Sequence, residues 1–218
     1  RSIGENAFCD SSIESLQIPS SVSDLNKYWN NELYYLKEIK VIDTKERNIK
    51  YIDNKYLVGK SNKKSDVFDV LLFAWRDIEE AIIPPQITRI ASNAFAYCQK
   101  LEKITISNNC KLQTIEDNAF INSSVKYIEI PSNIINLMSD WHNGMNDLKH
   151  IKIIKNGDEN VKILDCQYLV GTTDLKSDVF DILLFACRNI IKATIPSYIK
   201  IISNNAFSNC YYLLRVIF

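Results

Sequence analysis

The fold is decided by residues 83–106, which read IPPQITRIASNAFAYCQKLEKITI. This segment runs from the last residue of one short stretch, Ala81-Ile82-Ile83, to the last residue of the next, Ile104-Thr105-Ile106. The alternate apolar positions of these stretches are typical of half-buried β-strands. Ile83 and Ile106 are 23 positions apart. A period of about 20–29 residues built on one short strand is the signature of leucine-rich repeats.

The same strand-like pattern recurs along the chain. Its other copies are Leu16-Gln17-Ile18, Ile39-Lys40-Val41, Ile128-Glu129-Ile130, Ile151-Lys152-Ile153 and Ala193-Thr194-Ile195. A single strand of this kind cannot bury its apolar face, whereas a stack of them buries it continuously. The sequence therefore predicts a leucine-rich-repeat solenoid. We expect a curved right-handed stack with a parallel β-sheet on one face and short helices, turns and loops on the other. Ser92 or Asn93 would cap the short helix, and Phe95 and Cys98 would point inward.

A longer repeat contains the shorter one. When the chain is shifted by 112 positions against itself, 46 of the 106 overlapping residues are identical without a gap. Ser65-Asp66-Val67-Phe68-Asp69 then coincides with the stretch 177–181, and Trp29 with Trp141. We therefore expect one domain, residues 1–218, built of tandem units 1–112 and 113–218. The block Asp53–Arg76 predicts an irregular, loop-bearing coil in each unit.

Composition narrows the classes of function. Lys+Arg and Asp+Glu are both 26, so no net field favours nucleic acid or an anionic membrane. No window approaches the ~18 apolar residues of a membrane helix. The chain begins in the middle of a motif, so we expect it to be part of a longer protein. The six cysteines form no CxxC pair, and we expect buried thiols at Cys98 and Cys210.

Residues that could carry chemistry occur without the patterns that catalysis needs. Gly59-Lys60-Ser61 lacks the upstream glycine of a phosphate loop. The pairs Asp66/Asp69 and Asp178/Asp181 are expected to be loop acids, with Arg76 and Arg188 as candidate partners and calcium binding as the alternative. The two histidines, His142 and His150, have no nucleophile at a recurring spacing. The sequence thus predicts no enzyme activity, no cofactor and no metal site.

The outward-facing strand residues are the best candidate binding surface, because in a solenoid they form a continuous face. This face is mixed and polar, lacks the aromatic interleaving of single-stranded nucleic-acid sites, and suits a protein or glycan ligand. The rival site is formed by the loops Tyr28–Tyr35 and Trp141–Met145. The predicted ligand-binding residues are Lys40, Lys103, Thr105, Tyr127, Glu129, His150, Lys152 and Lys192.

The residues Ile83-Pro84, Ile87, Ile90, Ala94-Phe95, Cys98 and Leu101 carry a pattern that resembles the BspA-like, or treponemal-type, leucine-rich repeat. Residues 65–78, SDVFDVLLFAWRDI, and their copy 177–190 resemble the BspA-like surface antigens of trichomonads. The units Leu16–Val41 and Ile128–Ile153 depart from the pattern, since tryptophan stands where Ala-Phe is usual.

This resemblance implies a cell-surface or secreted protein that adheres to host cells, matrix or other microbes, and it implies no catalytic residues. The alternative is a non-catalytic intracellular protein-interaction scaffold. The sequon at Asn122 is consistent with secretion.

Overall fold

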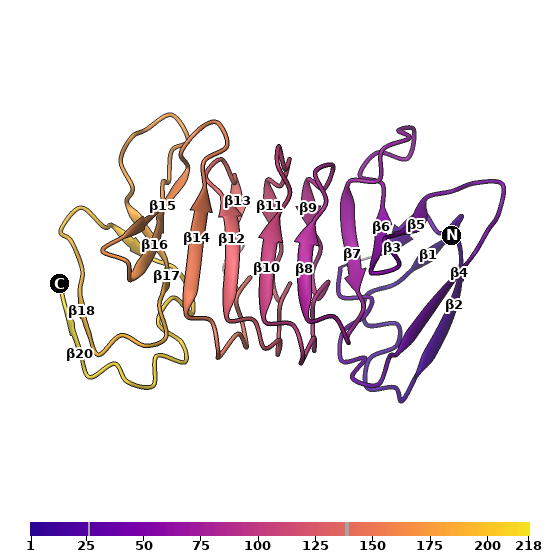
Figure 1. Cartoon of the computed structure of the whole chain (residues 1–218), viewed down its shortest axis with the longest axis horizontal. Coiled ribbons are helices and arrows are strands. Elements are labelled where there is room, and N and C mark those ends of the chain that lie inside the picture. Colours follow the sequence, from indigo (N-terminus) through magenta and orange to yellow (C-terminus); the bar gives the residue numbers. More distant parts are fainter. Residues whose placement is uncertain (26, 138–139) are drawn as a thin grey trace.

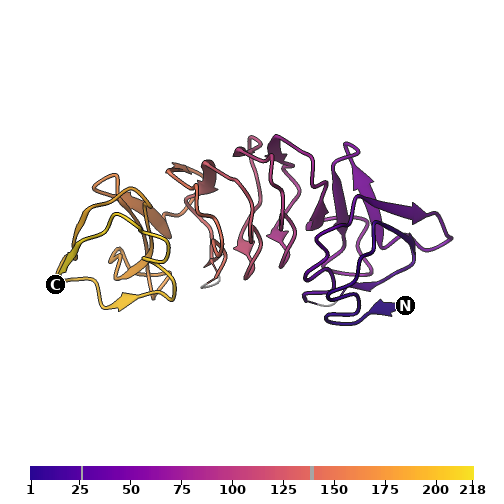
Figure 2. The same cartoon turned by 90° about the horizontal axis from the view of Figure 1, so that it is seen from below.

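The computed structural model describes residues 1–25, 27–137 and 140–218. The chain is an elongated stack of β-strand turns with its two termini at opposite ends (Figure 1). Turned by 90°, the successive turns lie side by side along the long axis (Figure 2). The leucine-rich-repeat architecture predicted from the 23-residue period is thus confirmed.

The predicted Ile-x-Ile strands form parallel ladders on one side of the stack. The central ladder, here called the first sheet, has the order β14-β12-β10-β8. Its strands are β8 (Glu80–Ile83), β10 (Lys103–Ile106), β12 (Tyr127–Pro131) and β14 (His150–Ile154). Two-stranded parallel ladders flank it at either end of the chain. These are β2 (Ser15–Pro19) with β4 (Glu38–Ile42), and β18 (Lys192–Thr194) with β20 (Arg215–Ile217).

The opposite side of the stack carries a second sheet made of very short strands and one longer insertion. Each turn contributes a two-residue strand: β9 (Arg89–Ile90), β11 (Thr114–Ile115) and β13 (Asn136–Leu137). β9 pairs in parallel with β7 (Val70–Ala74), which is antiparallel to β6 (Tyr56–Gly59), itself antiparallel to β5 (Ile49–Ile52). At the N-terminal end β1 (Ser2–Ile3) pairs with β3 (Asp24–Leu25).

The block Asp53–Arg76, which looks irregular in sequence, therefore supplies β6 and β7, and with β5 these form a three-stranded antiparallel meander. The second unit repeats it as β15 (Val161–Leu164), β16 (Tyr168–Gly171), β17 (Ile182–Ala186) and the parallel neighbour β19 (Ile201–Ile202). Each meander stands where the next solenoid turn would otherwise continue the ladder. This insertion is why β4 and β8, and likewise β14 and β18, belong to separate sheets.

The expectation of short helices is wrong: the described residues contain turns where helices were predicted. Asn93 and Tyr97 have φ angles of 59°, a left-handed conformation that ends a right-handed helix. The Phe95 N–H donates to Ala119 O at 2.8 Å, and the Tyr97 N–H donates to Ile121 O at 2.9 Å. The backbone N–H groups in this segment therefore alternate between the next turn of the stack and residues three positions earlier, as from Ala96 N–H to Asn93 O at 3.1 Å, and no continuous helical ladder forms.

A continuous column of aromatic rings fills the interior. Phe95 stacks on Phe120 with 5.3 Å between ring centroids, and Phe120 meets Trp141 at 6.2 Å. Trp141 in turn contacts Phe185 at 6.1 Å. Tryptophan thus occupies the core position that phenylalanine holds in the neighbouring turn, so the departure from the repeat pattern leaves the stack intact.

Candidate functional site

The first sheet brings together six of the eight predicted binding residues. Lys103, Tyr127 and His150 lie side by side on β10, β12 and β14. Two residues further along the same strands lie Thr105, Glu129 and Lys152, with Glu129 directly beside Lys152. We call these six residues the strand face. Their outward direction follows from the alternation of the strands, since Ile104 and Ile128 point into the core.

Lys40 and Lys192 lie outside the strand face. Lys40 is on β4 beside Gln17, and Lys192 is on β18 beside Arg215. Both are exposed, but the two meanders separate their ladders from the first sheet. The strand positions thus form three separate surfaces, of which the central one holds six of the predicted residues.

Glu129 organises the strand face. One of its carboxylate oxygens accepts hydrogen bonds from the Tyr127 hydroxyl at 3.0 Å and the Lys152 ammonium at 3.1 Å. The other accepts the Ile106 N–H at 3.2 Å. Partial burial opposes ionisation of the carboxyl group, but these three donors outweigh it and lower the pKa of Glu129. The carboxylate is therefore a fixed negative centre, and it raises the pKa of Lys152.

Around this centre the strand face exposes cationic and apolar groups. Lys103 is exposed, and its Nζ lies 6.0 Å from the centroid of the Tyr127 ring. His150 is also exposed. Ile82, which pairs with Thr105 across β8 and β10, has 59% of its surface exposed. The surface offers charged hydrogen-bond donors beside apolar area, a combination suited to recognition rather than to bond cleavage.

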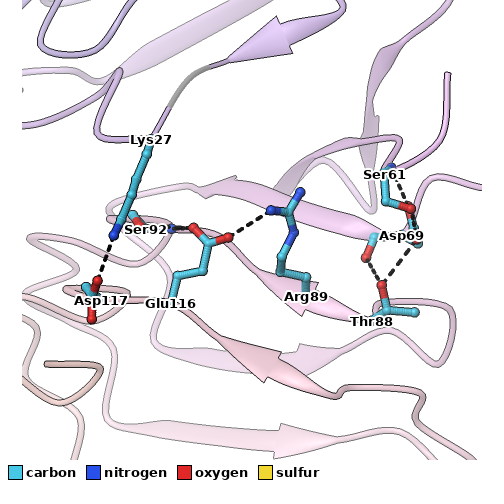
Figure 3. Close-up of polar contacts among 8 residues, drawn as sticks. All are labelled: Lys27, Ser61, Asp69, Thr88, Arg89, Ser92, Glu116 and Asp117. Atoms are coloured by element: carbon cyan, nitrogen blue, oxygen red, sulfur yellow. Dashed lines mark hydrogen bonds and ion pairs between the residues drawn. The ribbon is translucent and has the colours of Figure 1, made fainter. Parts of the chain in front are cut away.

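Sequence reasoning missed a polar network on the second sheet (Figure 3). Arg89 on β9 donates from Nη1 to Glu116 Oε1 at 2.8 Å. The other oxygen of Glu116 accepts the N–H and the hydroxyl of Ser92, each at 3.0 Å. Lys27 and Asp117, 90 positions apart, form an ion pair of 2.7 Å at the same place. The network connects three turns of the stack. Its only signal in the sequence is the polar residues that follow the two-residue strands of the second sheet, such as Ser92 after β9 and Glu116 after β11.

The paired acids of the meander close loops. Asp69 accepts hydrogen bonds from the Ser61 N–H at 2.8 Å and hydroxyl at 2.6 Å (Figure 3). Its copy Asp181 accepts the equivalent bonds from Thr173, at 2.9 and 2.8 Å. These contacts fit the expected role of loop acids. The suggestion that the arginines pair with these acids is wrong: Arg188 is buried and lies over the Phe185 ring at 4.2 Å.

Arg76 takes the same position in the first unit, 4.2 Å over Phe73. The remaining candidates also have structural surroundings. Gly59, which looked like part of a phosphate loop, ends the buried strand β6. In the rival loops, the side chains of Trp29 and Trp141 are in the core, whereas Tyr34 and Tyr35 are exposed.

The cysteines are all free thiols. Cys98 is buried as expected, whereas Cys210 is only partly buried. The ligand atoms of Cys9, Asp10 and Glu32 lie within 4.8 Å of one another, but the Cys9 thiol donates to Glu32 Oε2 at 2.9 Å. That hydrogen bond raises the pKa of Cys9 to about 11, so the thiol is protonated here. In the described part of the chain, no helix is long and apolar enough to cross a membrane.

Known proteins place the chain in a family. The model of the BspA type leucine rich repeat region matches six copies, over residues 1–69, 70–180 and 171–218. No curated protein matches the chain in sequence. Solved structures with the same fold include the pneumococcal vaccine antigen PcpA, with 21% identity and a TM-score of 0.60 over 99% of this chain and 49% of that one.

Two further bacterial structures are similar over the whole chain. A leucine-rich repeat protein from Eubacterium ventriosum has 22% identity and a TM-score of 0.64, over 52% of its own length. A leucine rich cell surface protein from Faecalibacterium prausnitzii has 17% identity and a TM-score of 0.58, over 64% of its length. The chain therefore spans about half to two thirds of these structures. The narrower resemblance to trichomonad antigens stays a prediction. Repeats matched from the first residue to the last show that the chain belongs to the BspA-type leucine-rich-repeat family.

Proposed function

We propose that the chain is a binding or adhesion module of a cell-surface or secreted protein, and that the strand face contacts a protein or glycan of a host, a matrix or another microbe. The observation that carries this proposal is the fixed Glu129 carboxylate surrounded by exposed Lys103, His150 and Lys152. Side chains held in place before binding lose less conformational entropy when a partner arrives.

The family supports this proposal. Leucine-rich-repeat proteins bind other proteins, and solenoids of this family are typically non-enzymatic. Two of the similar structures are described as a vaccine antigen and a cell surface protein. A surface location of this chain is consistent with those relatives, and recognition of a host or a glycan is our proposal for it.

The test is binding of the purified chain to intact epithelial cells and to arrays of matrix proteins and glycans. The test variant is Lys103→Glu with Lys152→Glu, on the strand face. The matched control is Lys40→Glu with Lys192→Glu, which changes the same charge on the flanking ladders. We expect saturable binding that is lost in the first variant and kept in the second. Equal loss in both would contradict a site on the strand face, and absence of binding by the folded chain would contradict adhesion.

A further inference from the structure

A cleft of about 520 Å³ separates β14 from β15 in the second unit. One wall is the strand β14 with the preceding Lys149, and the other is the beginning of β15. Cys166 and Cys187 also line it. Figure 1 shows β15 beyond β14, where the parallel ladder stops. The volume is within the usual range of ligand pockets, about 300–1,000 Å³.

This cleft has an apolar floor because two aromatic residues of the first unit have smaller counterparts in the second. In the first unit the rings of Tyr51 and Trp75 stack, with centroids 5.9 Å apart and planes 11° from parallel. A shift of 112 positions places Ile163 and Cys187 there, and both line the cleft. The smaller side chains leave the space that the two rings occupy in the first unit.

Both walls of the cleft are edge strands. β14 is the last strand of the first sheet, and β15 is the last strand of the second meander. The His150 N–H donates to Lys126 O at 3.1 Å and Ile154 O accepts the Ser132 N–H at 2.8 Å, both toward β12. Since successive peptide groups of a strand point to opposite sides, those of Ile151 and Ile153 point toward the cleft.

The first unit shows how such an edge is closed. There the Tyr51 hydroxyl donates to the carbonyl of Ile39 at 2.8 Å, and Ile39 is the counterpart of Ile151. Ile163, which replaces Tyr51, has no hydroxyl to make this bond. An exposed row of peptide groups is a template for pairing with another strand.

The rim of the cleft is basic. Its lining contains four lysines and a single carboxylate, that of Glu159. Lys155 pairs with Glu159 at 3.3 Å and Lys152 with Glu129 at 3.1 Å, and both lysine side chains remain largely exposed. The lysines are Lys149, Lys152, Lys155 and Lys162. This surplus of positive charge favours an acidic partner.

We propose that the cleft binds an extended acidic peptide segment of a partner protein, which adds as a strand to the edge of β14. Its backbone pairs with the peptide groups of Ile151 and Ile153, its apolar side chains enter the floor formed by Ile163 and Cys187, and its carboxylates face the lysines. Strand addition of this kind obtains affinity from main-chain bonds and specificity from pockets for alternate side chains. The inference rests on the proposed binding function and gives it a ligand class.

The test uses a capped peptide of roughly six residues, the usual length of a strand, in which valine alternates with glutamate. Its controls are the same peptide with lysine in place of glutamate and a version with N-methylated backbone amides. Binding is measured by calorimetry and by amide chemical shifts of the whole chain. The filled variant Ile163→Tyr/Cys187→Trp places at these two positions the residues that the first unit holds there.

We expect the glutamate peptide to bind, to shift the amide signals of Ile151 and Ile153, and to bind the filled variant about tenfold or more weakly, as for loss of a buried contact at an interface centre. The inference would be overturned if the glutamate peptide bound the filled variant as tightly as the unchanged chain. It would also be overturned if the lysine peptide or the N-methylated peptide bound the unchanged chain as tightly as the glutamate peptide does. Absence of binding by the glutamate peptide would also overturn it. Lys103→Glu alone changes a strand-face residue that does not line the cleft, so it tests the strand face separately and either proposal can fail without the other.

Discussion

The buried histidine of the second unit makes the fold sensitive to acid. His142 is fully buried, and its Nδ1 lies 3.0 Å from Arg188 Nη2. A guanidinium can only donate, so the imidazole accepts this bond in its neutral form. Burial and the adjacent positive charge of Arg188 lower the pKa of His142 from 6.5 to about 3. The first unit has Asn30 at the equivalent position, where the side chain donates to Asn93 O at 3.2 Å.

The size of the effect follows from the two pKa values. Below about pH 6.5 the unfolded chain binds a proton at His142 that the folded chain does not, so the free energy of unfolding decreases as the pH falls toward 3. At pH 5 the difference is about 1.5 pH units, or about 2 kcal/mol at ~1.4 kcal/mol per unit. Between about pH 7 and about pH 5 the free energy of unfolding of the wild-type chain should therefore decrease. The decrease for His142→Asn should be smaller by about 2 kcal/mol.

Urea unfolding at the two pH values measures this difference directly. The carboxyl group of Asp181, on the same meander as Arg188, does not interfere in this window. Hydrogen bonds from Thr173 and the ion pair with Lys200 lower the pKa of Asp181 to about 2, so its contribution is complete above the unfolded pKa, near 3.9, and is lost only as the pH falls through about 2. The same loss of stability in both chains between pH 7 and pH 5 would refute the reasoning on His142.

Three further predictions concern the core, the thiols and the meander. Phe95→Ala should cost about 3–5 kcal/mol because the ring is fully buried, whereas Phe207→Ala at a partly buried position should cost about 1–2 kcal/mol; equal costs in urea unfolding would contradict this. Iodoacetamide should modify the exposed Cys166 first, because burial raises the pKa of the interior thiols; peptide mass spectrometry over time would reveal any other order. Asp181→Asn should lower the melting temperature more than Asp178→Asn does, since the Asp181 carboxylate closes its loop and Asp178 is exposed.

Sequence periodicity predicts the strands of this fold well, because each Ile-x-Ile segment has one side that only stacking can bury. It predicts the opposite side of the stack poorly. The sequence predicts a helix cap at Ser92 or Asn93, yet Asn93 and its counterparts Asn118 and Asn205 before Ala-Phe all have a left-handed backbone conformation. Asparagine favours both roles. Only the bonds to the neighbouring turn, as from Phe95 N–H to Ala119 O, distinguish them.

The candidate binding surface was only partly predictable for a different reason. The phase of each strand gives the outward residues, and this placed Lys103, Tyr127 and His150 together. Whether neighbouring ladders join depends on the pairing of the inserted meanders. Apolar runs such as Val70–Ala74 indicate a buried strand but not its partner or direction. The separation of Lys40 and Lys192 from the strand face therefore could not be read from the sequence.

The two units show how one repeat architecture can have either a closed or an open edge. In the first unit Tyr51 and Trp75 fill the space between ladder and meander, and the Tyr51 hydroxyl caps the exposed carbonyl. In the second, Ile163 and Cys187 leave that space lined by lysines, although the strand pairing around it is the same. The fold does not require the cleft, since the first unit forms the same strands with Tyr51 and Trp75 at the positions of Ile163 and Cys187. Stability of the fold therefore does not explain the cleft, and the cleft lies beside an unpaired strand edge of the kind that proteins usually protect. A partner that covers this edge explains both features better.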